Sequence, residues 1–122
     1  MRVLMLIRIA NNKDYEDGKL LGPELDAAMG EVMAEWSESG ALVSAAGLKP
    51  TSWGARVRLS GGEVMLTDGP FTESKEVVGG FFLLEAKDKA AAVDMTRRFV
   101  EVHQRVLGKD FLLECEVRPL DG

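Results

Sequence analysis

Val3-Leu4-Met5-Leu6-Ile7-Arg8-Ile9, near the start of the chain, is an almost unbroken run of apolar residues. The polar residues Asn11-Asn12-Lys13-Asp14 follow it. A short apolar run that is bounded by polar residues is typical of a central strand with both faces buried. We therefore predict a central strand over residues 3–9, followed by a loop that ends at Gly22-Pro23.

A helix is predicted from Pro23 to Ser39. Proline suits the first turn of a helix, because its missing N–H would have no partner there. Apolar residues then recur at the spacing of an amphipathic helix. They are Leu25, Met29, Val32, Met33 and Trp36. Gly40 follows, and a glycine at this place favours the left-handed conformation that ends many helices.

Three strands are predicted after this helix. The first covers residues 41–47, and the second covers residues 53–60, where apolar and polar residues alternate from Ala55 to Ser60. Such alternation is typical of a strand with one exposed face. Gly61-Gly62 can supply the positive φ angles of a two-residue hairpin turn, so the chain is expected to return as a strand over residues 63–67.

The second half of the chain returns to the order of strand, helix and strand. A loop over residues 68–78 leads to a strand over 81–85, a helix over 88–107 and a final strand over 111–117. The resulting order, βαββαβ with an added hairpin strand, is that of a ferredoxin-like α+β fold. No linker interrupts it, so we predict a single domain over residues 1–122.

Such a fold places both helices on one face of the sheet and leaves the other face open. The strands over 3–9 and 81–85 are apolar on both sides, and a two-layer domain cannot cover both sides by itself. We therefore expect a homodimer in which the two sheets pack face to face, as a dimeric α/β barrel.

Composition excludes several classes of protein. The 122 residues carry 20 acidic and 15 basic side chains, a net charge of −5, which argues against a surface that binds nucleic acid or anionic membranes. No apolar run approaches the length of a membrane span, and no secretory signal is recognisable, so we expect a cytoplasmic protein. With one cysteine and one histidine there is no zinc-ligand pattern, and we expect neither a metal nor a cofactor.

Asp68 is the first candidate for chemistry, because it directly follows a predicted strand. One interpretation is structural, since an aspartate here can hydrogen-bond the backbone two residues on, and Gly69-Pro70 fixes a sharp reversal. The other is functional: at the rim of a cleft, a partly desolvated carboxylate can move protons. In that case Lys75 or Glu76 in the same loop would tune it.

His103 is the only histidine of the chain. In the predicted helix over 88–107 it lies among apolar positions, so it should point toward the sheet. One interpretation is a half-buried ring with one satisfied nitrogen. The alternative is a general base that lines a pocket, because the ordinary pKa of histidine is about 6.5.

Four further residues, Trp53, Arg58, Phe71 and Lys75, are candidates for contact with a ligand. Arg58, like Arg118, either pairs with carboxylates across strands or holds an anion. Trp53 begins a predicted strand and either walls a pocket or closes a dimer edge. Phe71 and Lys75 belong to the Asp68 loop. Cys115, with no cation nearby in the sequence, is interpreted as a packing residue.

One stretch has a distinctive order: Thr67-Asp68-Gly69-Pro70-Phe71, followed by Glu73, Lys75-Glu76 and Gly79-Gly80. It resembles the signature of the DGPF-domain branch of the YCII-related proteins, and the similarity extends over nearly the whole chain. The resemblance implies a ferredoxin-like fold, a dimeric α/β barrel and a cleft in which Asp68 is the acid/base residue. Relatives pair that aspartate with a histidine in the N-terminal half, where this sequence has none.

Two hypotheses of function follow from these residues and this resemblance. In the first, a dimer binds a small organic molecule near Asp68 and His103 and transfers protons, in lyase- or isomerase-like chemistry. In the second, the protein is a non-catalytic module that senses a ligand or binds a protein, and the resemblance implies association with an extracytoplasmic-function sigma factor. An acidic surface suits a basic protein partner.

Overall fold

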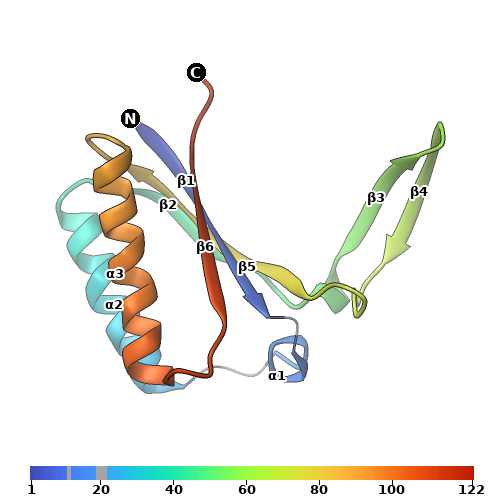
Figure 1. Cartoon of the computed structure of the whole chain (residues 1–122), viewed down its shortest axis with the longest axis horizontal. Coiled ribbons are helices and arrows are strands. Elements are labelled where there is room, and N and C mark those ends of the chain that lie inside the picture. Colours follow the sequence, from blue (N-terminus) through green and yellow to red (C-terminus); the bar gives the residue numbers. More distant parts are fainter. Residues whose placement is uncertain (11, 19–21) are drawn as a thin grey trace.

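A four-stranded antiparallel sheet forms the centre of the computed structural model, which describes residues 1–10, 12–18 and 22–122. Its strand order is β2-β5-β1-β6. The four strands are β1 (Arg2–Ala10), β2 (Leu42–Gly47), β5 (Glu76–Glu85) and β6 (Leu113–Pro119). Helices α2 (Pro23–Glu38) and α3 (Lys89–Leu107) lie side by side on one face (Figure 1). The predicted ferredoxin-like α+β fold is thereby confirmed.

Both long helices begin and end where the sequence indicates. Pro23 occupies the first turn of α2, and Gly40 follows the helix with a φ of 81°, in the left-handed region. The carboxylate of Asp88 accepts a hydrogen bond of 2.8 Å from the backbone N–H of Ala91 and so caps the start of α3. None of the helices among the described residues is long and apolar enough to cross a membrane.

The core fills the space between the two helices and the sheet. Three aromatic rings span it, with Trp36 of α2 edge-on to Phe82 of β5 at 5.6 Å and Phe82 edge-on to Phe99 of α3 at 5.2 Å. Offset and edge-on contacts of this kind are favoured by the charge distribution of aromatic rings. The buried aliphatic side chains around them are Met5, Leu25, Val32, Leu84 and Val102.

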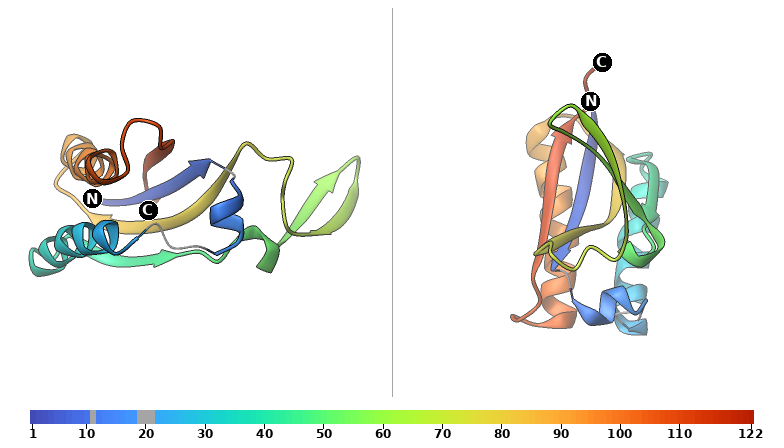
Figure 2. Two further views of the ribbon diagram at one scale, coloured as in Figure 1. Left: turned by 90° about the horizontal axis from the view of Figure 1, so that it is seen from below. Right: turned by 90° about the vertical axis from the view of Figure 1, so that its right-hand side faces the viewer.

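The other face of the sheet is not covered by a helix, and we call it the open face. Val3 and Met5 of β1 are buried against the helices, whereas Leu4 and Leu6 point the other way and are only half-buried. In the single chain β1 is therefore buried on one face only, as expected for a two-layer domain, and burial of its second face by a partner stays a prediction. The reason is that both helices connect strands across the same side of the sheet, as Figure 2 shows.

Strands β3 (Ala55–Ser60) and β4 (Glu63–Asp68) pair with each other in a separate two-stranded sheet. We call this hairpin, residues 55–68, the arm, and the rest of the chain the body. Gly61 and Gly62 form its turn with φ angles of 58° and 78°, as predicted. The arm projects from the body on the side of the open face (Figures 1 and 2).

Several predicted boundaries differ from the structure. A single helical turn, α1 (Lys13–Glu16), occupies part of the predicted loop, because the side chain of Asn12 accepts a hydrogen bond from the N–H of Tyr15. Trp53 belongs to a short 3₁₀ turn, Thr51–Trp53, and not to a strand. The last strand is shifted by two residues. The loop prediction at residues 11 and 19–21 lies outside the described residues.

Strand β5 begins at Glu76, five residues earlier than predicted, and contains Gly79-Gly80. A Cβ at Gly79 would lie 3.2 Å from Ile9 of β1, and one at Gly80 would lie 2.7 Å from the carbonyl oxygen of Ala46 in β2. These glycines therefore permit a close approach of neighbouring strands, and they do not mark a turn.

Candidate functional site

A cavity of about 380 Å³, partly open to solvent, lies between the sheet and the two long helices, and we call it the interior cavity. Its lining is mostly apolar and aromatic, and includes Ile7, Met29, Met33, Phe82, Phe99 and Phe111. Two side chains with titratable groups interrupt this lining, His103 of α3 and Tyr15 of α1. An apolar cavity with a small number of polar groups is the usual form of a site for small molecules.

His103 is held in one orientation by its own helix. Its Nδ1 lies 2.9 Å from the carbonyl oxygen of Phe99, one turn earlier. A carbonyl can only accept, so Nδ1 carries the hydrogen of the neutral ring and Nε2 carries the lone pair. The rings of Phe99 and Phe111 lie 4.6 and 6.3 Å from the imidazole. No described residue donates a hydrogen bond to Nε2.

Burial also decides the charge of this histidine. Only 6% of the residue is exposed, and removal from water lowers the pKa of His103 below 6.5, partly offset by the hydrogen bond to Phe99. The imidazole is therefore neutral at neutral pH. In this form Nε2 can accept a hydrogen bond or a proton.

Tyr15 lines the same cavity from α1. Its hydroxyl lies 3.4 Å from the carbonyl oxygens of Leu48 and Lys49 and 3.5 Å from that of Val78. Burial, and secondarily the charge of Glu16, raises the pKa of Tyr15 above 10.0, so its hydroxyl keeps its hydrogen. Tyr15 was not among the residues expected at a site, because the single turn of α1 was predicted as loop.

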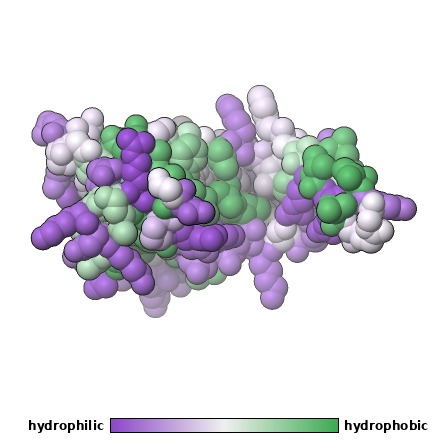
Figure 3. All heavy atoms as spheres, turned by 90° about the horizontal axis from the view of Figure 1, so that it is seen from above, coloured by the Kyte–Doolittle hydropathy of each residue, from purple (hydrophilic) through white to green (hydrophobic). Residues whose placement is uncertain are grey.

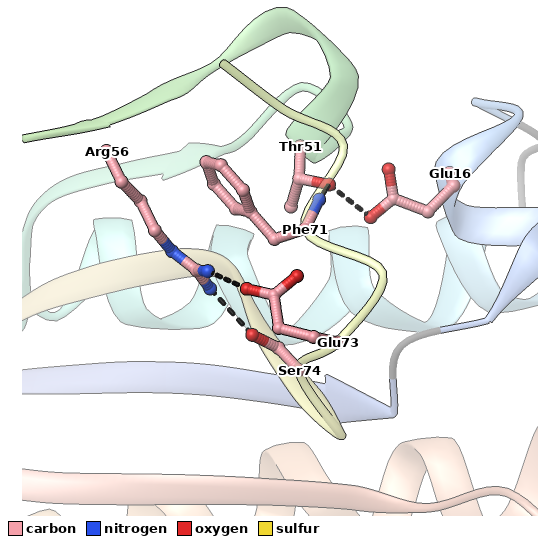
Figure 4. Close-up of polar contacts among 6 residues, drawn as sticks. All are labelled: Glu16, Thr51, Arg56, Phe71, Glu73 and Ser74. Carbon is pink, nitrogen blue, oxygen red and sulfur yellow. Dashed lines mark hydrogen bonds and ion pairs between the residues drawn. The ribbon is translucent and has the colours of Figure 1, made fainter. Parts of the chain in front are cut away.

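The loop that follows Asp68 is fixed to the body by a series of close contacts (Figure 4). A Cβ at Gly69 would lie 1.7 Å from the carbonyl oxygen of Thr51, so only glycine fits here. The Gly69 N–H donates to the carbonyl of Gly54 at 2.9 Å, and the Phe71 N–H donates to the Thr51 hydroxyl at 3.1 Å. That hydroxyl donates in turn to a carboxylate oxygen of Glu16 at 2.6 Å. We call these contacts the clasp.

Arg56 of β3 extends the clasp to the second half of the loop. Its guanidinium lies over the ring of Phe71 at 3.8 Å, and it donates hydrogen bonds to Glu73 and, at 2.6 Å, to the hydroxyl of Ser74. A hydrogen bond from its own backbone N–H and another from Arg56 lower the pKa of Glu73 below 4.5. The sequence pattern identified Arg56 only as a polar residue of an alternating strand.

A second, open cavity of about 620 Å³ lies at the base of the arm, and we call it the arm-base cavity. Its lining includes Arg8, Lys49 and Arg56 together with Trp53 and Phe71. The Lys49 ammonium lies 5.1 Å from the centre of the Trp53 ring. Two of the four residues that were expected to contact a ligand, Trp53 and Phe71, therefore lie in this cavity.

Asp68 lies apart from both cavities. It pairs with Ala55 across the arm, so its side chain leaves the ribbon on the face opposite to that of Arg56. Asp68 is exposed and lines neither cavity, and the same holds for Arg58 and Lys75. The single chain thus does not bring Asp68 and His103 into one site.

Cys115 of β6 is half-buried and packs against the core. Burial, and secondarily the charge of Glu114, raises the pKa of its thiol to about 11. A thiol that keeps its proton at neutral pH is a poor nucleophile. Within the described part of the chain, no three histidine, cysteine or acidic side chains are grouped as metal ligands.

Two comparisons place the chain among known proteins. An uncharacterized protein of Rhizobium meliloti (strain 1021) is 39% identical over 66 residues, which are 54% of this chain and 53% of that protein. The match thus spans about half of the relative's length. The model of the YCII-related domain matches residues 1–106. This match covers the sheet strands β1, β2 and β5, the arm, helix α2 and all but the last residue of α3, so the chain belongs to the YCII-related family.

Proposed function

We propose that the interior cavity binds a small aromatic molecule that carries a hydroxyl group, and that His103 accepts the hydrogen bond from this hydroxyl. The observation that carries the proposal is the tautomer of His103. The Phe99 carbonyl accepts the hydrogen bond from Nδ1–H, so Nε2 has no hydrogen and can act as an acceptor. An acceptor in an apolar lining discriminates strongly in favour of a ligand that offers a donor.

The dimensions and the lining of the cavity support this class of ligand. A cavity of about 150 Å³ is enough for benzene. The interior cavity, at about 380 Å³, has room for a molecule of two fused rings. Its aromatic lining residues, Phe82, Phe99 and Phe111 among them, favour edge-on and stacked contacts with such rings.

The same geometry supports proton transfer. A neutral imidazole with a free nitrogen is the form that removes a proton from a bound phenol or from an acidic C–H group. The Tyr15 hydroxyl, whose hydrogen is retained, is the second polar group beside such a ligand. We therefore assign the role of base in the single chain to His103, whereas a role for Asp68 requires that its carboxylate be covered by another molecule.

The test compares two probes that differ by one hydroxyl, 1-naphthol and naphthalene. We expect the wild-type protein to bind 1-naphthol about fivefold more tightly than naphthalene, since one buried hydrogen bond contributes about 1 kcal/mol. The variant His103→Phe keeps an aromatic ring but removes the acceptor, so the preference for naphthol should disappear. Calorimetric titration of both probes measures this.

Asp68→Asn is the matched control, because Asp68 lies outside the interior cavity. This variant should keep the full preference for naphthol. The proposal fails if the wild-type protein binds neither probe, or if the preference survives in His103→Phe. Loss of the preference in Asp68→Asn alone would assign the hydroxyl to Asp68 and overturn the role given to His103.

We also propose that two copies of the chain pair through their open faces. Leu4 and Leu6 of β1 lie opposite Leu83 and Phe81 of β5, so four half-buried apolar side chains form the centre of this face. Charged side chains of β6 border it, including Glu116, which pairs with Arg8 at 3.8 Å. An apolar centre with a charged border is the usual composition of a protein interface. Light scattering should give twice the mass of 13.3 kDa.

A further inference from the structure

The two faces of the arm differ sharply in composition. Across the hairpin, Val57 pairs with Leu66 and Leu59 with Val64, and paired residues point to the same face. Between 69% and 74% of each of these four residues is exposed. The opposite face carries Arg56, Arg58, Ser60, Glu63, Met65 and Thr67. Figure 3 shows the apolar atoms gathered on the arm.

A ribbon of this kind is not stable in water by itself, because a two-stranded hairpin has too few contacts to fix its structure. In the described structure, the strands of the arm pair only with each other. The clasp holds the base of the arm through Gly69 and Arg56, but it does not reach Leu59 or Val64 at the other end. The apolar face of the arm therefore requires a cover from outside the chain.

The chain carries two uncovered apolar surfaces, the apolar face of the arm and the open face of the sheet. Both lie on the side of the molecule away from the helices (Figures 1 and 2), and the strands of one do not pair with those of the other. In a dimer with twofold symmetry every contact occurs twice, with the roles of the two copies exchanged. A surface that is covered on one copy is therefore covered on the other copy as well. A second copy of this chain necessarily carries the same two apolar surfaces, the open face and the apolar face of the arm, and can therefore cover both.

We propose that the arm packs its apolar face against a second copy of this chain, in the dimer that forms through the open faces. This inference rests on the proposed dimer. The four apolar side chains at the centre of the open face are few for an interface, because stable interfaces use roughly 20–30 residues on each side. The arm supplies Ala55, Val57, Leu59, Val64 and Leu66 in addition.

Docking of the arm also changes the surroundings of Asp68. This residue pairs with Ala55 and so stands at the base of the apolar face. In the proposed dimer its carboxylate therefore lies at the margin of the docked face of the arm. The dimer thereby supplies the covered position that the single chain does not give to Asp68.

The experiment compares the same substitution at two adjacent residues of the arm. Leu66→Lys places a charge on the apolar face, and Met65→Lys places the same charge on the opposite face, where Met65 pairs with Arg58. We expect Leu66→Lys to raise the dissociation constant of the dimer about 30-fold or more, as for a central interface residue. Met65→Lys should change it less than about threefold, as for a residue at the rim. Sedimentation equilibrium measures both, and circular dichroism verifies that each variant is folded.

A third variant, Leu6→Lys, separates the arm from the open face. If the wild-type protein is a monomer, both the proposed dimer and the docking of the arm are wrong. A second outcome is that Leu6→Lys dissociates the dimer, whereas Leu66→Lys and Met65→Lys leave its dissociation constant equally low. In that case the open-face dimer stands and the docking of the arm is overturned. Dissociation by Leu66→Lys and by Leu6→Lys, but not by Met65→Lys, supports the inference.

Discussion

The body and the arm use the same kinds of residue in opposite surroundings. Leu84 of β5 is completely buried, whereas 69% of Leu66 of β4 is exposed, although both are leucines on antiparallel strands with apolar neighbours. The body covers its strands with its own helices, and the arm has no such layer. An apolar pattern therefore indicates that a strand face will be covered, but it does not indicate whether the cover belongs to the same chain.

The largest expected effect concerns the core of the body. Phe82 contacts both Trp36 and Phe99, so Phe82→Ala should lower the free energy of unfolding by about 3–5 kcal/mol, through lost burial and a residual cavity. Its neighbour Phe81 points to the open face and is half-buried. Phe81→Ala should cost about 1 kcal/mol in dilute solution, where the monomer dominates. Urea unfolding measures both, and equal losses would contradict the assignment of the two faces.

The next effect concerns the junction between body and arm. Gly69→Ala introduces a Cβ that collides with the Thr51 carbonyl, and relief requires that the clasp open. We expect a loss of about 3 kcal/mol, at the upper end of the usual cost of overpacking. The control is Gly30→Ala in α2, where nothing lies within 4 Å of the added Cβ. Since alanine is the better helix former, Gly30→Ala should stabilise by about 0.5–1 kcal/mol. A Gly69→Ala variant as stable as the wild type would show that the clasp is dispensable.

A smaller effect depends on pH. The pKa of His103 is lower in the folded protein than its ordinary value of 6.5, so protons bind more tightly to the unfolded chain. The stability that neutral His103 provides is complete above about pH 6.5 and is lost as the pH falls through the folded pKa. Between about pH 7.5 and pH 5, the wild-type protein should lose stability relative to His103→Phe. Parallel curves for the two proteins would contradict the burial of a neutral histidine.

The smallest expected effect concerns the arm. At concentrations where the protein is monomeric, Leu59→Ser should change the free energy of unfolding by less than about 0.5 kcal/mol, because 74% of Leu59 is already exposed. The same denaturant titration used for Phe82→Ala serves here. A loss of 2 kcal/mol or more would mean that the arm is covered within the single chain, since only a buried leucine costs that much.

Much of the fold could be predicted from local signals. The spacing of apolar residues identified both long helices, and Gly61-Gly62 identified the hairpin. Contacts between distant residues were harder to predict. The predicted strand began only after Gly79-Gly80, whereas strand β5 passes through both glycines, and the close approach of Ile9 and Ala46 accounts for glycine at these positions. The separation of the arm from the main sheet is likewise invisible in an alternating pattern.

The candidate site was predicted in part, for a related reason. The helical position of His103 indicated that its side chain points toward the sheet, and the structure places it in the interior cavity. The neighbour Tyr15 comes from a single turn of helix with no sequence signal of its own. The position of Asp68 at a strand end was correct, but the face to which it points depends on its pairing with Ala55 in the arm.

Amide hydrogen exchange at two protein concentrations tests the central claim most directly, namely that the body is complete in one chain and the arm is completed by a second copy. Concentrations well below and well above the dissociation constant of the dimer would be compared. We expect the amides of residues 55–68 to become more protected from exchange as the dimer forms. The amides of residues whose side chains lie in the helix-covered core, such as Met5 and Phe82, should stay equally protected. An arm that exchanges at the same rate at both concentrations would contradict the account.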